Sequence, residues 1–276
     1  MSNAQRKDKS LTVADIYEQK GYFLPFDLLT EAEARALRDE IEDAENALRD
    51  DPDKLSLFIK YTDRLLPSVD RLIRSEKLLD AVSSIMGPDL HVWNAGLFIK
   101  EAKSKKIISW HQDLTYWGLR DAQEITCWLA LSPATKESGC MKFVPGSHKS
   151  DIVEHVDTMN ENNLLSRGQE LAVDVNEDDA IYAELQPGQM SFHHGHLFHA
   201  SEENMSDDRR IGLSIRIIRT DMKQAGGAKT LVAHVKGEDN FGHFKVAGHP
   251  KGRLAEEDFA LCRADREIKE RILYSR

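Results

Sequence analysis

The chain has 276 residues, of which 41% are hydrophobic and 30% are charged, and its formal net charge is −10. This composition is typical of a globular protein and argues against disorder. The acidic balance argues against nucleic-acid binding, which needs clustered lysine and arginine. The sequence has no long apolar run and no apolar signal segment near its start, so we expect no membrane partner and a cytoplasmic location.

The first third of the chain has the pattern of helices. A short helix is expected to start at residues 10–14 and to end near Gly21, and residues 23–25 then look extended. Thr30 and Glu33 have the spacing of a capping box, and the helix that follows carries an apolar stripe of Ala34, Leu37, Ile41 and Ala44. A third helix is expected over residues 67–86, because Gly87 and Pro88 end it.

After Pro88 the sequence pattern changes from helices to short strands. Candidate strands cover residues 91–100, 125–131, 189–192 and 211–218, without the long intervening helices of a parallel sheet. An antiparallel barrel or sandwich therefore fits better than a parallel α/β fold. Residues 151–183 are acidic and irregular, as in a functional or mobile loop, and residues 255–274 predict a surface helix.

Trp110-His111-Gln112-Asp113 is the segment with the clearest chemical meaning. In an extended strand, residues i and i+2 point to the same side, so His111 and Asp113 are expected to aim at one point. A second histidine from a distant segment would complete a triad of two histidines and one carboxylate. Such a triad binds Fe(II) and leaves positions for a bidentate co-substrate and O₂. Alone, a His-x-Asp pattern is weakly specific.

The second histidine is sought in a segment with four histidines within seven residues: His193, His194, His196 and His199. Arg210 follows His199 by eleven residues across a polar turn. A hairpin of that size would set His199 and Arg210 on neighbouring strands. An arginine can hold a carboxylate through two parallel hydrogen bonds, as the far carboxylate of 2-oxoglutarate requires.

Alternation along the last strand supports an inward-facing Arg210. Gly212, Ser214 and Arg216 share its face, whereas the other face carries Ile211, Leu213, Ile215 and Ile217. A barrel strand with a polar, site-lining face explains this pattern. The alternative is an amphipathic strand whose Arg210 faces solvent.

These pieces together resemble the phytanoyl-CoA dioxygenase family of Fe(II)/2-oxoglutarate oxygenases, from about Gly21 to Arg219. The matching motifs include residues 110–113, 126–131, 137–149, 192–201, Asn204 and residues 209–210. The resemblance implies a mainly β fold, a double-stranded β-helix (jelly-roll, cupin-like) core with flanking helices. It also implies one domain over residues 1–276, with N-terminal helices over 10–87, the core over about 88–220 and a C-terminal extension over 221–276.

The resemblance also implies roles for single residues. His111, Asp113 and His199 would bind the iron, and Arg210 would hold 2-oxoglutarate. Further co-substrate contacts are expected from Ser201, Trp128, Thr126 and Asn94. Contacts to the substrate are expected from Lys100, Tyr116, Trp117 and Arg216.

The implied reaction is hydroxylation of an unactivated C–H bond, with O₂ and 2-oxoglutarate converted to product, succinate and CO₂. Asp113 favours hydroxylation over halogenation, because related halogenases replace this carboxylate. Lys100, Arg167 and Arg216 favour a small polar or anionic metabolite. Two alternatives stay open: a cupin-type metal-dependent isomerase or hydrolase, and an inert jelly-roll binding module.

Overall fold

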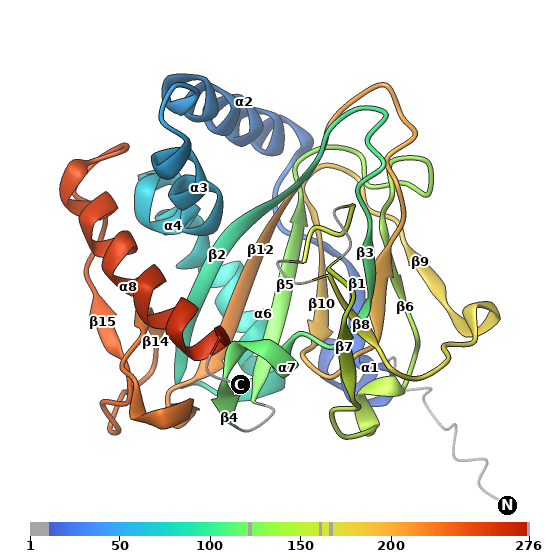
Figure 1. The fold of residues 1–276 in the computed structure, drawn as a ribbon. Coiled ribbons are helices and arrows are strands. Elements are labelled where there is room, and N and C mark those ends of the chain that lie inside the picture. Colours follow the sequence, from blue (N-terminus) through green and yellow to red (C-terminus); the bar gives the residue numbers. More distant parts are fainter. Residues whose placement is uncertain (1–10, 121–122, 160–161, 166–167, 275–276) are drawn as a thin grey trace, which may run out of the picture.

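The computed structural model describes residues 11–120, 123–159, 162–165 and 168–274 (Figure 1). The helices are α1 Val13–Lys20, α2 Glu31–Leu48, α3 Pro52–Lys60, α4 Thr62–Leu65, α5 Pro67–Ile73, α6 Glu76–Met86, α7 Leu114–Trp117 and α8 Glu256–Tyr274, with short 3-10 turns η1 Ser147–Lys149, η2 Glu177–Asp179 and η3 Ala225–Gly227.

The strands are β1 Tyr22–Asp27, β2 Leu90–Lys100, β3 Ile108–His111, β4 Leu119–Arg120, β5 Glu124–Ala130, β6 Met141–Phe143, β7 His155–Asp157, β8 Gln169–Leu171, β9 Ile181–Ala183, β10 Gln189–His194, β11 His199–Ser201, β12 Arg210–Arg219, β13 Lys223–Gln224, β14 Leu231–Lys236 and β15 Lys245–Ala247.

The N-terminal helices follow their local signals. Thr30 and Glu33 cap α2 reciprocally, with the Thr30 amide donating to the Glu33 carboxylate at 2.8 Å. The predicted apolar stripe of α2 is buried. The single helix expected over residues 67–86 is instead two helices, α5 and α6, because Ser75 adopts an extended backbone and begins a new helix.

Two sheets form the body of the protein. The large sheet has the order β1-β10-β5-β12-β2-β14-β15, and the small sheet has the order β3-β11-β6-β9. Ile211, Leu213, Ile215 and Ile217 of β12 face away from the small sheet and join the hydrophobic core that the helices α1 to α6 and α8 complete. The opposite face of β12 looks toward the small sheet (Figure 1). The predicted jelly-roll core with flanking helices is confirmed.

The later segments are more ordered than their sequence suggests. Residues 151–183, expected to be irregular, include the antiparallel pair β7 and β8 and the strand β9. Helix α8 lies beside β14 and β15 (Figure 1) and buries Phe259 and Cys262 in the core. In the same helix, Asp265 accepts hydrogen bonds from the Tyr61 hydroxyl and the Leu231 amide. One side of the predicted surface helix is thus a core element.

None of the helices in the described ranges is long and apolar enough to cross a membrane.

Candidate metal centre

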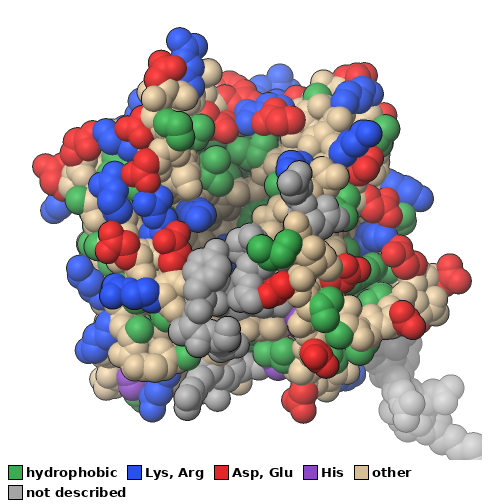
Figure 2. Space-filling model, in the orientation of Figure 1, with side chains coloured by type: hydrophobic (Ala, Val, Ile, Leu, Met, Phe, Trp, Pro, Cys, Tyr) green, Lys and Arg blue, Asp and Glu red, His purple; other side chains and the backbone are tan. Residues whose placement is uncertain are grey.

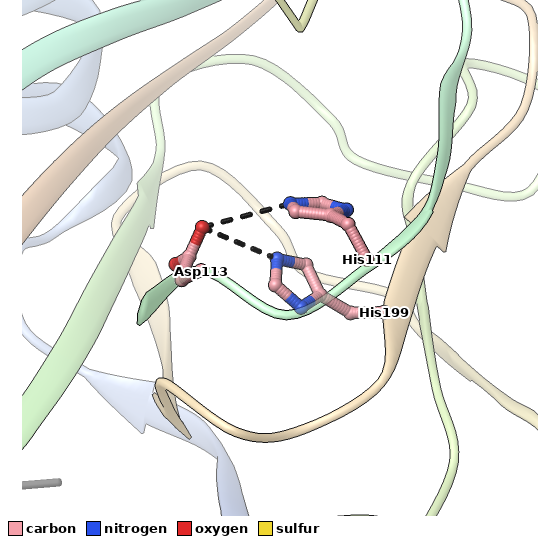
Figure 3. A group of neighbouring side chains, drawn as sticks. All are labelled: His111, Asp113 and His199. Carbon is pink, nitrogen blue, oxygen red and sulfur yellow. Dashed lines mark ion pairs between the residues drawn. The ribbon is translucent and has the colours of Figure 1, made fainter. Parts of the chain in front are cut away.

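His111, Asp113 and His199 point toward one another between the two sheets (Figure 3). Oδ1 of Asp113 lies 3.5 Å from Nε2 of His111 and 3.8 Å from Nε2 of His199. One ligand atom from each of the three buried residues falls within 4.8 Å of the other two. Two imidazoles and one carboxylate, converging in this way, form the donor set of a non-heme iron centre.

The cause of the convergence differs from the expected strand alternation. His111 is the last residue of β3, but Asp113 has helical backbone angles and stands at the start of α7. His199 comes from β11, which pairs with β3 so that His199 is opposite His111. A strand end, a turn and a neighbouring strand therefore build the triad.

The backbone orients both histidine ligands. Nδ1 of His111 lies 2.9 Å from the carbonyl oxygen of Ser109, and Nδ1 of His199 lies 2.9 Å from that of Leu197. A carbonyl can only accept, so each Nδ1 carries the hydrogen and each Nε2 presents its lone pair to the metal position. Burial and the neighbouring His111 hold the pKa of His199 well below its ordinary value, which keeps its ring neutral.

The second oxygen of Asp113 is held by the protein. Oδ2 accepts a hydrogen bond of 3.0 Å from the Thr126 hydroxyl and lies 3.6 Å from Nε2 of His193. Burial opposes ionisation of Asp113, but His111 and His193 outweigh it and hold the carboxyl pKa well below its usual range. Oδ1 is thereby left for a metal.

Glu124 completes this arrangement as a neutral acid. Its Oε1 lies 2.8 Å from the Thr126 hydroxyl, but that hydroxyl has one hydrogen and Asp113 takes it. Burial, with Asp113 nearby, raises the pKa of Glu124 well above its usual range. The protonated Glu124 therefore donates to Thr126, which donates to Asp113.

The sequence analysis did not assign His193 and Glu124 to the site. The alternation of side chains along β10 and β5 nevertheless indicates the face on which each of them lies. Met190 and Phe192 of β10 belong to the core on the helix side of the sheet, so His193 faces the small sheet and His194 does not. His193 lines the cavity behind the carboxylate of Asp113. Glu124 likewise shares the face of Thr126 and Trp128 on β5.

A cavity of about 390 Å³, including its opening to solvent, contains the triad. A recess is visible near the centre of the face drawn in Figure 2, over the space between β12 and β3 in Figure 1. The walls are Phe98, Ile108, His111, Asp113, Thr126, Trp128, Met141, His193, His199, Ala200, Ser201, Arg210, Ser214 and Arg216.

Arg210 is 1% exposed and has no anionic partner among the described residues. Its Nε and Nη2 atoms are buried without a hydrogen bond, and its guanidinium lies 5.3 Å from the Trp128 ring. Burial lowers its pKa to about 10. Leaving a buried charge unpaired costs about 3–5 kcal/mol, so the cavity is built for an anion at this point.

We expected a hairpin to place His199 and Arg210 on neighbouring strands, but the structure does not have this arrangement. His199 is in the small sheet and Arg210 is in the large sheet, because residues 202–209 cross from one to the other. Both side chains nevertheless line the same cavity.

Lys100 and Ser201 lie beside Arg210. Lys100 pairs with Arg210 in the sheet register, and its Nζ donates to the Ser201 hydroxyl at 2.7 Å and to the carbonyl of Glu202. Burial and the Arg210 charge lower the Lys100 pKa to about 6. Lys100 therefore sits at the Arg210 end of the site, although we expected it at the substrate.

Arg216 lines the other end of the cavity. Its Nη1 donates to Oδ1 of Asn94 at 2.8 Å, and its guanidinium lies 4.7 Å from the Trp117 ring. Asn94, expected at the co-substrate, thus holds Arg216 instead. The Tyr116 side chain and Arg167 lie outside the described residues.

Residues 17–212 match the phytanoyl-CoA dioxygenase (PhyH) family. The chain belongs to this family. The predicted family is thereby confirmed, and the matched segment contains the triad and Arg210 but ends before Arg216.

Several curated proteins resemble this chain. A probable alpha-ketoglutarate-dependent hypophosphite dioxygenase of Stutzerimonas stutzeri is 27% identical over 157 residues, which are 56% of this chain and 54% of that protein. An ectoine dioxygenase of Bordetella parapertussis is 26% identical over 149 residues, 49% of this chain and 48% of that enzyme. The chain thus spans about half the length of these curated relatives.

The non-heme monooxygenase ThoJ, in its apo form, has a similar structure with a TM-score of 0.87. It is 28% identical, and the match covers 96% of this chain and 98% of ThoJ. The epimerase SnoN, crystallised with Fe³⁺, alpha-ketoglutarate and nogalamycin RO, has a TM-score of 0.63 at 18% identity. The match to SnoN supports the fold alone.

Proposed function

We propose that this PhyH family member is an Fe(II)- and 2-oxoglutarate-dependent dioxygenase that hydroxylates an unactivated C–H bond of a small polar or anionic metabolite. The observation that carries the proposal is the buried, unpaired Arg210 in the same cavity as the triad. One bound molecule with a carboxylate at each end can satisfy both features. The reaction consumes substrate R–H, 2-oxoglutarate and O₂, and yields R–OH, succinate and CO₂.

His111, Asp113 and His199 would hold the iron, which supplies O₂ activation when it is bound. Arg210 would take the far carboxylate of 2-oxoglutarate on its free Nε and Nη2 edge, which is suited to a bidentate pair. Ser201 lines the same cavity and would contact the same carboxylate, and Lys100 donates to the Ser201 hydroxyl from behind. Trp128 supports the guanidinium from one face.

The rest of the cavity has a protective role. Phe98, Ile108 and Met141 exclude water from the reacting C–H bond. Thr126 and His193 keep Asp113 in one orientation while ligands exchange. The protein positions the reactants and shields them, whereas the iron and its co-substrate perform the oxidation.

The chain is also proposed to act as one domain. Residues from α1 to α6, from the large sheet and from α8 belong to one continuous hydrophobic core. Limited proteolysis should therefore give no stable fragment that lacks either α2 or α8.

The test is anaerobic addition of Fe(II) and 2-oxoglutarate to the purified protein. A weak visible charge-transfer band is expected, and O₂ should then produce succinate when a substrate is present. His199→Ala should abolish the band, whereas His196→Ala, in the loop just before β11 and outside the triad, should keep it. Absence of the band in the wild-type protein would sink the proposal.

A cupin-type isomerase or hydrolase would need the triad but no anion at Arg210. Such an enzyme would bind metal and leave 2-oxoglutarate unbound. Titration of the metal-loaded protein with 2-oxoglutarate separates the two activities, and an inert binding module would bind neither iron nor 2-oxoglutarate.

A further inference from the structure

Arg216 is a second buried cation in the cavity, far from the first. Both arginines lie on β12 and face the same side of the sheet, six residues apart. At about 3.3 Å per residue, their Cα atoms are roughly 20 Å apart. A five-carbon diacid is much shorter than this separation of the Cα atoms, and in the proposed function its two ends are taken by Arg210 and the metal.

One edge of the Arg216 guanidinium is free. The side chain is 9% exposed, Nη1 is bound to Asn94, and Nε is buried without a hydrogen bond. Nε and Nη2 form the side edge of the guanidinium, the edge that can bind a carboxylate through two parallel hydrogen bonds. Trp117 and Phe98 flank the group at 4.7 and 5.5 Å from the guanidinium carbon to the ring centres.

The neighbouring acids do not neutralise Arg216. Asp113 is committed to the metal through Oδ1 and to Thr126 and His193 through Oδ2. Glu124 has Oε1 at 2.8 Å from the Thr126 hydroxyl and makes no ion pair with Arg216. Among the described residues, Arg216 makes no ion pair within 4.0 Å of a carboxylate oxygen.

A count of the charges in the cavity also indicates that Arg216 has no balancing anion. With iron and 2-oxoglutarate bound, two positive charges on the metal and one on Arg210 balance Asp113 and the dianion. Lys100 is not part of this cavity lining, and its Nζ donates to the Ser201 hydroxyl and to the carbonyl of Glu202. Arg216 is left as one surplus positive charge in a desolvated cavity, and such a charge needs a partner.

We propose that Arg216 binds the substrate, and that the substrate is a small carboxylic acid with one net negative charge. Its carboxylate takes the free Nε and Nη2 edge of Arg216, and its carbon chain reaches past Phe98 toward the triad. Asn94 and Trp117 act as positioning residues for Arg216. This inference rests on the proposed function, because it takes the Arg210 end to be filled by 2-oxoglutarate.

The test uses binding rather than turnover. The full-length protein is loaded with Zn(II), which is redox-inert, and saturated with 2-oxoglutarate. Benzoate, cyclohexanecarboxylate and hexanoate are then titrated, each beside its own primary amide, and affinity is read by ligand-observed NMR. In the wild-type protein at least one acid should bind about ten-fold more tightly than its amide, as expected for a charge-assisted pair.

Three variants test whether Arg216 is the residue that causes the preference for the acid over its amide. Arg216→Gln should bring the acid-to-amide ratio close to one, and Arg216→Lys, which keeps the charge without the fork, should give an intermediate ratio. Arg219→Gln is the matched control, because Arg219 ends the same strand but pairs with Asp221 at the surface. That variant should behave as wild type.

Three results would overturn the inference: no acid preferred by the wild-type protein, an unchanged ratio in Arg216→Gln, or an equal loss in Arg219→Gln. The affinity for 2-oxoglutarate separates this failure from failure of the proposed function. It should stay within about two-fold of wild type in Arg216→Gln, because Arg210 is intact. A wild-type protein that does not bind 2-oxoglutarate at all would contradict the proposed function itself.

Discussion

Thr126 donates its hydroxyl hydrogen to Oδ2 of Asp113 at 3.0 Å, and this bond joins β5 to the turn that carries the carboxylate ligand. The bond leaves Oδ1 of Asp113 facing both ligand histidines. Hydrogen bonds to metal ligands of this kind set the orientation and basicity of the ligand. Thr126 was expected at the co-substrate, but the structure places it behind the metal.

Thr126→Val removes this donor while preserving the shape of the side chain. Loss of such a partner typically weakens metal binding by about 10- to 100-fold. We expect the dissociation constant for Co(II), measured by anaerobic titration of the visible spectrum, to rise by that factor. Thr126→Ser keeps the hydroxyl and should stay near wild type; an equal loss in both variants would point to packing instead.

Arg210→Met should stabilise the metal-free protein in the absence of 2-oxoglutarate. The wild-type cation is buried with two unpaired nitrogens, and replacing buried charges with apolar groups of similar volume is often stabilising by about 1–4 kcal/mol. Urea unfolding gives the free energy of unfolding. The same variant should lose the rise in melting temperature that 2-oxoglutarate gives the metal-loaded wild type. A variant less stable than wild type would contradict the view that Arg210 waits for an anion.

Gly212→Ala should disturb the co-substrate end of the cavity. A Cβ at Gly212 would lie 1.8 Å from Cζ2 of Trp128, so the indole ring must move away from Arg210. Overpacking of this kind costs about 1–3 kcal/mol, and affinity for 2-oxoglutarate should fall with it. Gly248→Ala is the control, because a Cβ there meets nothing within 4 Å. Calorimetric titration with 2-oxoglutarate reads both variants, and normal affinity in Gly212→Ala would refute the steric argument.

The metal-free protein should lose stability as the pH falls from about 6.5 to about 4. Burial lowers the pKa of His91 to about 4 and that of His194 to about 3, so both rings are neutral in the folded protein at neutral pH. Between these values and the ordinary 6.5, the unfolded chain binds more protons, and stability therefore falls as the pH is lowered. Each ring contributes up to about 1.4 kcal/mol per pH unit.

His91→Phe tests whether the buried His91 ring contributes to this loss of stability at low pH. The variant keeps a ring beside Phe244 but removes one titrating group. Its free energy of unfolding, measured by urea titration at pH 7, 6, 5 and 4, should decline less steeply than that of the wild type. Equal slopes would show that His91 is not buried as a neutral ring.

Sequence reasoning reached the triad because its residues lie in ordered motifs with family spacing. It also placed Arg210 on the polar face of β12, since the alternation of four aliphatic residues on the other face is a local signal. It selected His199 among four histidines, in agreement with the triad, but left His193 without an assigned role in the site. Which of them faces inward depends on the pairing of β10 with β5, where His193 is opposite Thr126. The expected roles of Asn94 and Lys100 also changed, because their hydrogen-bond partners come from other strands. Asn94 binds Arg216 of β12, and Lys100 binds Ser201 of β11.

The sequence by itself determined the local features of this protein: the capping box at Thr30, the two-sided pattern of β12, and the family to which the motifs belong. These follow from interactions between residues close together in the chain. Only the tertiary structure decided that Glu124 keeps a proton, that Arg210 lacks a partner and that Arg216 retains a free edge. Each of those depends on burial and on which distant side chains meet, because desolvation and nonlocal hydrogen bonds set the charge state of a group.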